Sequence, residues 1–238
     1  MFDLPVGLPS ELVPLSWLIG VWEGSGVLEY KIGEESVSRT FGHRISFSHD
    51  GLPHLNYSSY TWLEPETPVS AAPADTDPAV PSSETDAAAP TAALPALTLP
   101  PEMMSDEKTP LVTESGYWRL SRHQGDGDPG PGMLPGTGQR PFTSAAAVET
   151  LRNRDGGFDI EVTLVHPGGV AELYLGQVKG PRIDLVTDAV LRTAGAKPYA
   201  AATRLYGLVD NHLLWAWDIA ALGQDLRTHA SGRLARVE

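Results

Sequence analysis

Short runs in which apolar and polar residues alternate, separated by tight-turn sequences, recur through most of the chain. In such a run every second side chain lies on one face, which is the pattern of a half-buried β-strand. Phe41, His43, Ile45 and Phe47, for example, share one face of an early run. Residues typical of tight turns follow at 155–157, 166–169, 179–182 and 210–211. This pattern indicates a fold built from β-hairpins.

The runs between these turns predict roughly ten strands at a spacing typical of all-β proteins. They cover 20–26, 41–47, 57–62, 116–120, 148–152, 158–165, 170–178, 183–191, 199–209, 213–222 and 229–237. One short helix is predicted over 10–18, with Ser10 as its N-cap and Pro14 limiting its length. Because no helices alternate with the strands, we expect an antiparallel sandwich or an up-and-down barrel. A barrel of eight to ten strands can hold one small ligand.

Two stretches lack the alternation and interrupt the single domain that we expect over 1–238. Residues 64–110 are rich in Ala, Pro, Thr and Ser and carry nine acidic residues against one lysine. Such a composition predicts a disordered, acidic insertion. Residues 121–145 are rich in Gly and Pro and predict a second insertion, a flexible loop. What remains is the size of one domain.

Composition excludes several classes of protein. The 238 residues carry a formal net charge of −13, which would repel a phosphate backbone and argues against nucleic-acid binding. The chain has no cysteine, so disulfides, thiolate metal sites and a cysteine nucleophile are excluded. No apolar run approaches the roughly 20 residues that span a bilayer, and the first residues lack the pattern of a signal peptide. We therefore expect a cytoplasmic protein without a membrane partner.

The first distinctive motif is the glycine-rich sequence around Trp22. Gly20, Gly24 and Gly26 flank this tryptophan near the start of the first predicted strand. A tryptophan here can close one end of a barrel, where its N–H needs a partner, and glycines let the strand bend. This motif is a better marker of the fold than of a binding site.

His229 is the candidate ligand residue. It lies in the last predicted strand, where a neutral imidazole on the inner face could bind a metal or haem iron, although an ordinary surface or core histidine fits as well. The other six histidines of the sequence show no two- or three-ligand spacing of the kind that binds zinc. Phosphate-binding loops, nucleophile motifs and an obvious acid/base pair of carboxylates are also missing from the sequence.

Together these segments resemble the nitrobindin family, whose barrels are similar in shape to fatty-acid-binding proteins and lipocalins. The motif GVWEGSG resembles the family's GxWxGxG. The resemblance continues through FSHDGLPHLNYSSYTW (47–62), TESGYWRL (113–120), EVTLVHPGGVAELYLG (161–176), AKPYAAATRLYGL (196–208) and ALGQDLRTHASGRLAR (221–236). The two predicted insertions fall between matching strands, where loops are tolerated.

The resemblance implies a ten-stranded antiparallel barrel that binds one haem b per chain, with His229 as the axial ligand of the iron. Lys197 matches a family lysine near the haem edge, where a cation could pair with a propionate; a solvated turn lysine is the alternative. Ile32 stands where the family has a threonine that lines the haem pocket.

Three functions are therefore open. The first is an enzyme, a peroxynitrite isomerase, that converts peroxynitrite to nitrate at ferric haem and also binds nitric oxide, as a monomer or homodimer. The second is a haem-free carrier of a fatty acid or another small apolar ligand, which Ile32 favours. The third is an interaction module that uses the acidic insertion.

Overall fold

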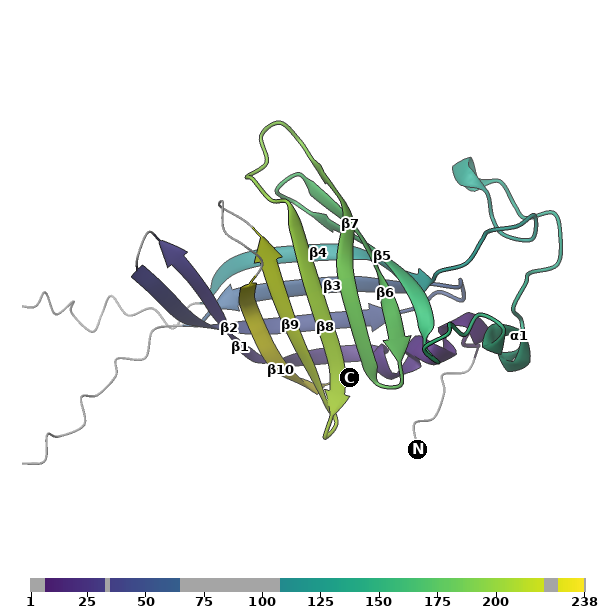
Figure 1. Ribbon diagram of the computed structural model, residues 1–238, viewed down its shortest axis with the longest axis horizontal. Coiled ribbons are helices and arrows are strands. Elements are labelled where there is room, and N and C mark those ends of the chain that lie inside the picture. The colour runs from purple at the N-terminus through teal and green to yellow at the C-terminus, as the bar shows by residue number, and fades with distance from the viewer. Residues whose placement is uncertain (1–6, 33–34, 65–107, 221–226, 238) are drawn as a thin grey trace, which may run out of the picture. The chain divides into compact units, whose positions relative to one another are not determined.

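The chain forms a closed antiparallel barrel in the computed structural model, which describes residues 7–32, 35–64, 108–220 and 227–237 (Figure 1). Consecutive strands are hydrogen-bonded neighbours, and β1 also pairs with β10, so the sheet has no free edge. The prediction of a ten-stranded up-and-down barrel is confirmed. Its strands are β1 (Gly20–Ile32), β2 (Glu35–Ser48), β3 (Leu55–Leu63), β4 (Thr109–Leu120), β5 (Phe158–His166), β6 (Val170–Lys179), β7 (Arg182–Arg192), β8 (Ala201–Val209), β9 (His212–Ala220) and β10 (Arg227–Arg236).

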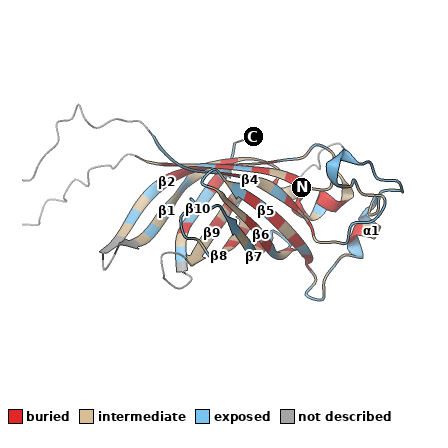
Figure 2. Cartoon of the chain, turned by 90° about the horizontal axis from the view of Figure 1, so that it is seen from above, coloured by how far each residue is buried: buried red, intermediate tan, exposed pale blue. Residues whose placement is uncertain are grey.

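The core fills the barrel interior with every second side chain of the strands. In β5, Phe158, Ile160, Val162 and Leu164 are buried, whereas the intervening residues are more exposed. Figure 2 shows the same alternation of buried and exposed positions along several strands. This is the period of two that a sheet with one solvated face requires.

A short helix lies at one end of the barrel, as predicted, but it is a 3-10 helix. It is η1 (Ser10–Leu18), and the residue at its N-cap position is Pro9 rather than Ser10, with no side-chain cap hydrogen bond. Leu12, Leu15 and Leu18 recur every three residues, the period of a 3-10 helix, and all three are fully buried. This apolar side of η1 therefore joins the core at that end, where η1 contacts β4 and β6.

Trp22 ties the first strand to this helix. Its Nε1 donates a 2.7 Å hydrogen bond to the Leu18 carbonyl, so the indole is both fully buried and satisfied. Gly24 and Gly26 let β10 approach β1 closely, because a Cβ at Gly24 would meet the Arg233 carbonyl oxygen at 2.3 Å. The glycine motif therefore allows the close pairing of β1 and β10 that closes the barrel.

A second buried contact at this end involves Arg122, which follows β4. Its guanidinium donates to both carboxylate oxygens of Asp128 at 2.6 and 2.8 Å, and its Nε donates to Glu11 of η1. The side chains of all three residues are less than 10% exposed. The ion cluster therefore holds the segment after β4 against η1.

The predicted strand over 148–152 was wrong. The structure has the helix α1 (Ala145–Glu149) there, and its Ser144 side chain accepts a hydrogen bond from the Ala147 N–H. A serine N-cap before three alanines favours a helix, and only Arg152 bridges to Phe158. Before α1, the stretch 121–144 contains turns and the 3-10 helix η3 (Pro131–Met133).

Most of the predicted acidic insertion, residues 65–107, lies outside the described residues, and β4 begins at Thr109. Within the part of the chain that the structure describes, no helix is long and apolar enough to cross a membrane.

Candidate functional site: a cavity beside His229

An irregularity in β10 determines where His229 points. The β9–β10 ladder pairs Thr228 with Asp218 and Ala230 with Trp217, so His229 is an extra residue between two regular pairs. Such a β-bulge allows two consecutive side chains to lie on the same side of a sheet. His229 and Ala230 accordingly both line a cavity inside the barrel.

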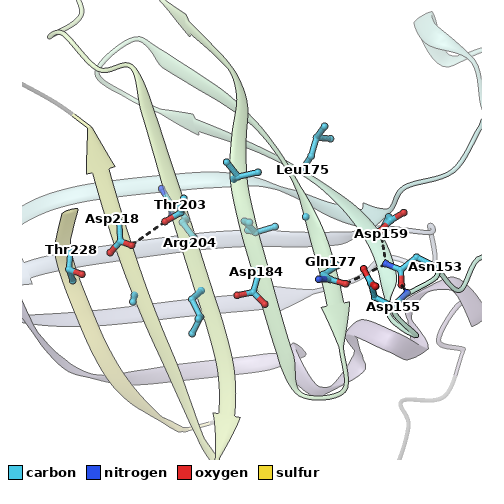
Figure 3. Close-up of a pocket in the computed structure, with 15 residues that line it drawn as sticks. Asn153, Asp155, Asp159, Leu175, Gln177, Asp184, Thr203, Arg204, Asp218 and Thr228 are labelled. Atoms are coloured by element: carbon cyan, nitrogen blue, oxygen red, sulfur yellow. Dashed lines mark hydrogen bonds between the residues drawn. The ribbon is translucent and has the colours of Figure 1, made fainter. Parts of the chain in front are cut away.

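Thr228 lies on the opposite side of the same strand. It lines an open groove on the outer face of the barrel, together with Asp184 and Asp218 (Figure 3). In this groove the Thr203 hydroxyl donates to Asp218 at 3.2 Å. The change from an outward Thr228 to an inward His229 and Ala230 is the expected consequence of the bulge.

The cavity beside His229 has apolar and aromatic walls and a polar floor. Its volume is about 120 Å³. The walls are formed by Leu28, Phe41, Leu111, Val112, Tyr206, Trp215, Trp217 and Ala230, whereas the polar lining consists of His43, Tyr57, Ser59, Thr61, Glu114, Arg204 and His229.

Trp217 connects His229 to the interior of the barrel. The two ring centroids lie 5.7 Å apart with the planes at 86°, an edge-to-face contact that orients the partly buried imidazole. On the Trp217 ring lies the Arg204 guanidinium, with its Cζ 4.6 Å from the ring centroid. Arg204 is therefore packed against the residue that packs against His229.

Arg204 is almost completely buried and paired with two carboxylates. Its Nη1 and Nη2 donate to Glu114 at 2.7 and 2.8 Å, and Nη2 lies 3.5 Å from Glu172. Burial alone would raise the pKa of Glu114, but the Arg204 guanidinium lowers this pKa to about 2. Glu114 is therefore ionised at neutral pH.

Other side chains satisfy the second carboxylate. His166 Nε2 lies 2.6 Å from Glu172, and the Tyr174 hydroxyl donates to Glu172 at 2.5 Å. The Tyr199 hydroxyl also donates to Glu172. Burial is the main cause that raises the pKa of Tyr174 and of Tyr199 well above the ordinary value of a phenol, so both phenols stay protonated.

The cavity floor contains a second histidine, His43. Its Nε2 lies 2.8 Å from Ser59 Oγ, and its ring packs edge-to-face against Trp215 at a centroid distance of 4.8 Å. Burial lowers the pKa of His43 to about 4, so the imidazole is neutral at pH 7. His43 Nδ1 is buried and finds no hydrogen-bond partner among the described residues.

The structure separates the two residues that the sequence linked to haem. His229 lines the cavity, whereas Lys197 is exposed in the loop between β7 and β8 and is not among the lining residues. The Lys197 carbonyl accepts a 3.3 Å hydrogen bond from Arg192. Ile32 is the last residue of β1. The motif residues Gly20, Trp22, Gly24 and Gly26 are also absent from the cavity lining.

Sequence reasoning missed the polar interior. The carboxylates looked scattered along the chain, yet Glu114 and Glu172 converge on Arg204. Strand alternation did place His43 on the same face as Phe41, Ile45 and Phe47, and a histidine among buried aromatics was a signal that this face is not purely structural.

The residues of the cavity fit a haem. His229 lines the cavity and is the candidate to hold the iron, beside a wall of aromatic and aliphatic side chains that suit the apolar faces of a porphyrin. A closed β-barrel with such an internal cavity defines the class of ligand-binding barrels.

Comparison with known proteins identifies the family. Residues 11–236 match the family described as "THAP4-like, heme-binding beta-barrel domain", and the chain belongs to this family. A "Peroxynitrite isomerase" of Clavibacter michiganensis subsp. michiganensis is 60% identical over the full length of both chains. Another protein of that name, from Leifsonia xyli subsp. xyli, is 57% identical, again over both full lengths.

A solved structure supports the fold independently. It is that of Rv2717c from M. tuberculosis, with a TM-score of 0.56 and 21% sequence identity, and the match covers 99% of this chain and 100% of that one. The family match and the close relatives confirm the resemblance to the nitrobindin family inferred from sequence motifs, and the solved structure confirms the fold.

Proposed function

We propose that this protein binds one haem b per chain at His229 and converts peroxynitrite to nitrate. The single observation that carries the proposal is the bulge in β10, which directs the His229 imidazole into an aromatic cavity. The relatives named peroxynitrite isomerase, which align with the whole chain at 57–60% identity, support the reaction. Nitric oxide is a second small ligand for the same site.

When bound, ferric haem supplies the iron at which peroxynitrite rearranges to nitrate. The protein has three tasks. His229 would hold the haem iron through its imidazole, and the edge-to-face contact with Trp217 limits rotation of its ring. Leu28, Phe41 and Trp215 would form apolar walls beside the iron and restrict water there.

Lys197 is the proposed partner of a haem propionate. A propionate that extends from the mouth of the barrel into solvent would meet an exposed cation there. Because such an ion pair is solvated, we expect it to contribute little to haem affinity.

The test is a haemin titration of the haem-free full-length protein, followed by Soret absorption. We expect saturation at one haem per chain for the native sequence and loss of the haem-bound spectrum for His229→Ala. His123→Ala, which changes an exposed histidine of the 121–144 stretch, is the matched control and should bind haem normally. An unchanged titration for His229→Ala would rule out His229 as the ligand.

Loaded protein is then mixed with peroxynitrite, and nitrate is quantified against nitrite. Faster decay with a higher nitrate yield is the expected result, and it should be absent from His229→Ala. If haem binds but the decay and yield match those of buffer, the protein binds haem without this activity.

A haem-free carrier of a fatty acid or another small apolar ligand is the second candidate function. Ile32 favours it, because this residue stands where the nitrobindin family has a threonine hydroxyl. Native mass spectrometry of protein from haem-supplied cells separates the two functions. A bound mass equal to haem supports the first, and a bound lipid supports the second.

A further inference from the structure

We propose that the floor of the cavity is a separate subsite for a small uncharged molecule that carries a hydroxyl donor, with His43 Nδ1 as the acceptor. The subsite belongs to the same cavity as His229, but it is defined by β2, β3 and β4 and does not require haem. Four observations support it.

The first observation is an unpaired nitrogen. His43 is only 3% exposed, and its Nδ1 has no hydrogen-bond partner within the described part of the chain. An unsatisfied polar atom in the interior is unfavourable, so a buried nitrogen without a partner in the protein calls for one from water or a bound molecule. Since His43 lines the cavity, a molecule in the cavity can supply that partner.

The second observation is the direction of the hydrogen bonds that anchor His43. Glu114 is ionised and can only accept, so the 3.1 Å contact to it is a donation from the Tyr57 hydroxyl. Ser59 Oγ lies 2.8 Å from His43 Nε2, and a serine hydroxyl oxygen can accept from that nitrogen. In the proposed subsite the proton of the neutral imidazole is on Nε2, so that Nε2 donates to Ser59 and Nδ1 presents a lone pair to the cavity.

The third observation concerns charge. The groups that act electrostatically on His43 are the Glu114 carboxylate and the Arg204 guanidinium, and these are already joined to each other by two hydrogen bonds. Glu172 adds a second carboxylate to the same guanidinium, with His166 beside it. An anion would find no unpaired cation at this floor, and a neutral imidazole cannot compensate a charge, so an uncharged ligand is favoured.

The fourth observation is the position of His43 along the strands and the size of the cavity. His43 is paired with Gly24 of β1, whereas Ala230, next to His229, is paired with Leu28. The two positions are therefore offset by four residues along β1, a span of about 13 Å. The cavity of about 120 Å³ is comparable to apolar cavities that bind benzene. A single aromatic ring with one hydroxyl group matches both the walls and the floor.

Phenol and toluene are a suitable pair of probes, because they have similar shapes and only phenol has a donor. Calorimetric titration of the haem-free full-length protein should show phenol binding that weakens about tenfold in His43→Leu, while toluene binding changes by less than about twofold. His123→Leu, an exposed histidine, is the control and should change neither. Equal losses for both probes, or no phenol binding to the native protein, would overturn the subsite.

A second measurement does not depend on any variant. Nitrogen-15 NMR of labelled native protein should show His43 protonated at Nε2, with an Nδ1 resonance that shifts when phenol is added. A proton on Nδ1 in the free protein contradicts the proposal. Because both experiments use haem-free protein, their failure would leave the proposed haem chemistry untouched, and failure of haem binding would leave the subsite untouched.

Discussion

Two buried arginines, Arg122 and Arg204, make similar contacts for different purposes. Each donates two hydrogen bonds to one carboxylate in a bidentate arrangement, Arg122 to Asp128 and Arg204 to Glu114. Arg122 and Asp128 are six residues apart in the chain, whereas Arg204 and Glu114 are ninety apart. The first pair fastens a local segment to η1; the second joins β8 to β4 across the barrel interior, since these strands are not neighbours in the sheet.

The difference between the two arginines shows that the role of a buried ion pair depends on the residues around it. Arg122 lies over the Phe142 ring, and its other carboxylate partner is Glu11 of η1. Arg204 lies over Trp217, the residue that packs on His229, and it also lines the cavity. A buried pair is often no more stabilising than apolar residues of equal volume, so a cavity-lining pair such as Arg204–Glu114 is a candidate for a role in binding.

The largest effect is expected from Arg204→Met, which leaves Glu114 and Glu172 buried without their shared cation. Breaking a buried pair in this way typically lowers the free energy of unfolding by about 3–5 kcal/mol. Urea denaturation of the haem-free protein measures the loss. A smaller loss than that of Arg122→Met would mean that water or His166 compensates the carboxylates, and the contrast between the two clusters would fail.

An intermediate effect is expected from Arg122→Met. Its partners lie at the end of the barrel, where the Asp128 carboxylate can reorient toward water, so we expect a loss of about 1–3 kcal/mol in the free energy of unfolding. Haem affinity should be unchanged, because Arg122 is not a lining residue of the cavity. Weakened haem binding in this variant would show that the two clusters are coupled.

The smallest effect is expected from Asp128→Asn and depends on pH. The Arg122 hydrogen bonds lower the pKa of Asp128 to about 2, below the value of about 3.9 in an unfolded chain. Ionised Asp128 therefore stabilises the fold fully above pH 4, and this contribution is lost as the pH falls through 2. The urea midpoints of native protein and variant should differ at pH 6 and converge near pH 2; a constant difference would exclude ionisation as its cause.

The sequence predicted the barrel well because its information is local. Alternation and turn residues identify strands one at a time, and the error at 148–152 arose where three alanines after a serine formed α1 instead. The cavity depends on relations between distant residues. The bulge at His229 depends on the register between β9 and β10, so the sequence of one strand does not predict it. The ion pair of Glu114 and Arg204 depends on closure of the sheet, because the two residues are ninety positions apart in the chain.

Closure between β1 and β10 also affects when the site can exist during folding. The strand that carries His229 has β1 as one of its two neighbours, so the first and last strands must meet before the cavity has a wall. Contacts between residues so far apart along a chain are slow to form, because a long loop has to be closed first. A chain lacking β10 would have neither the imidazole nor the β1–β10 pairing, and haem uptake would therefore report that the whole barrel has been made and closed.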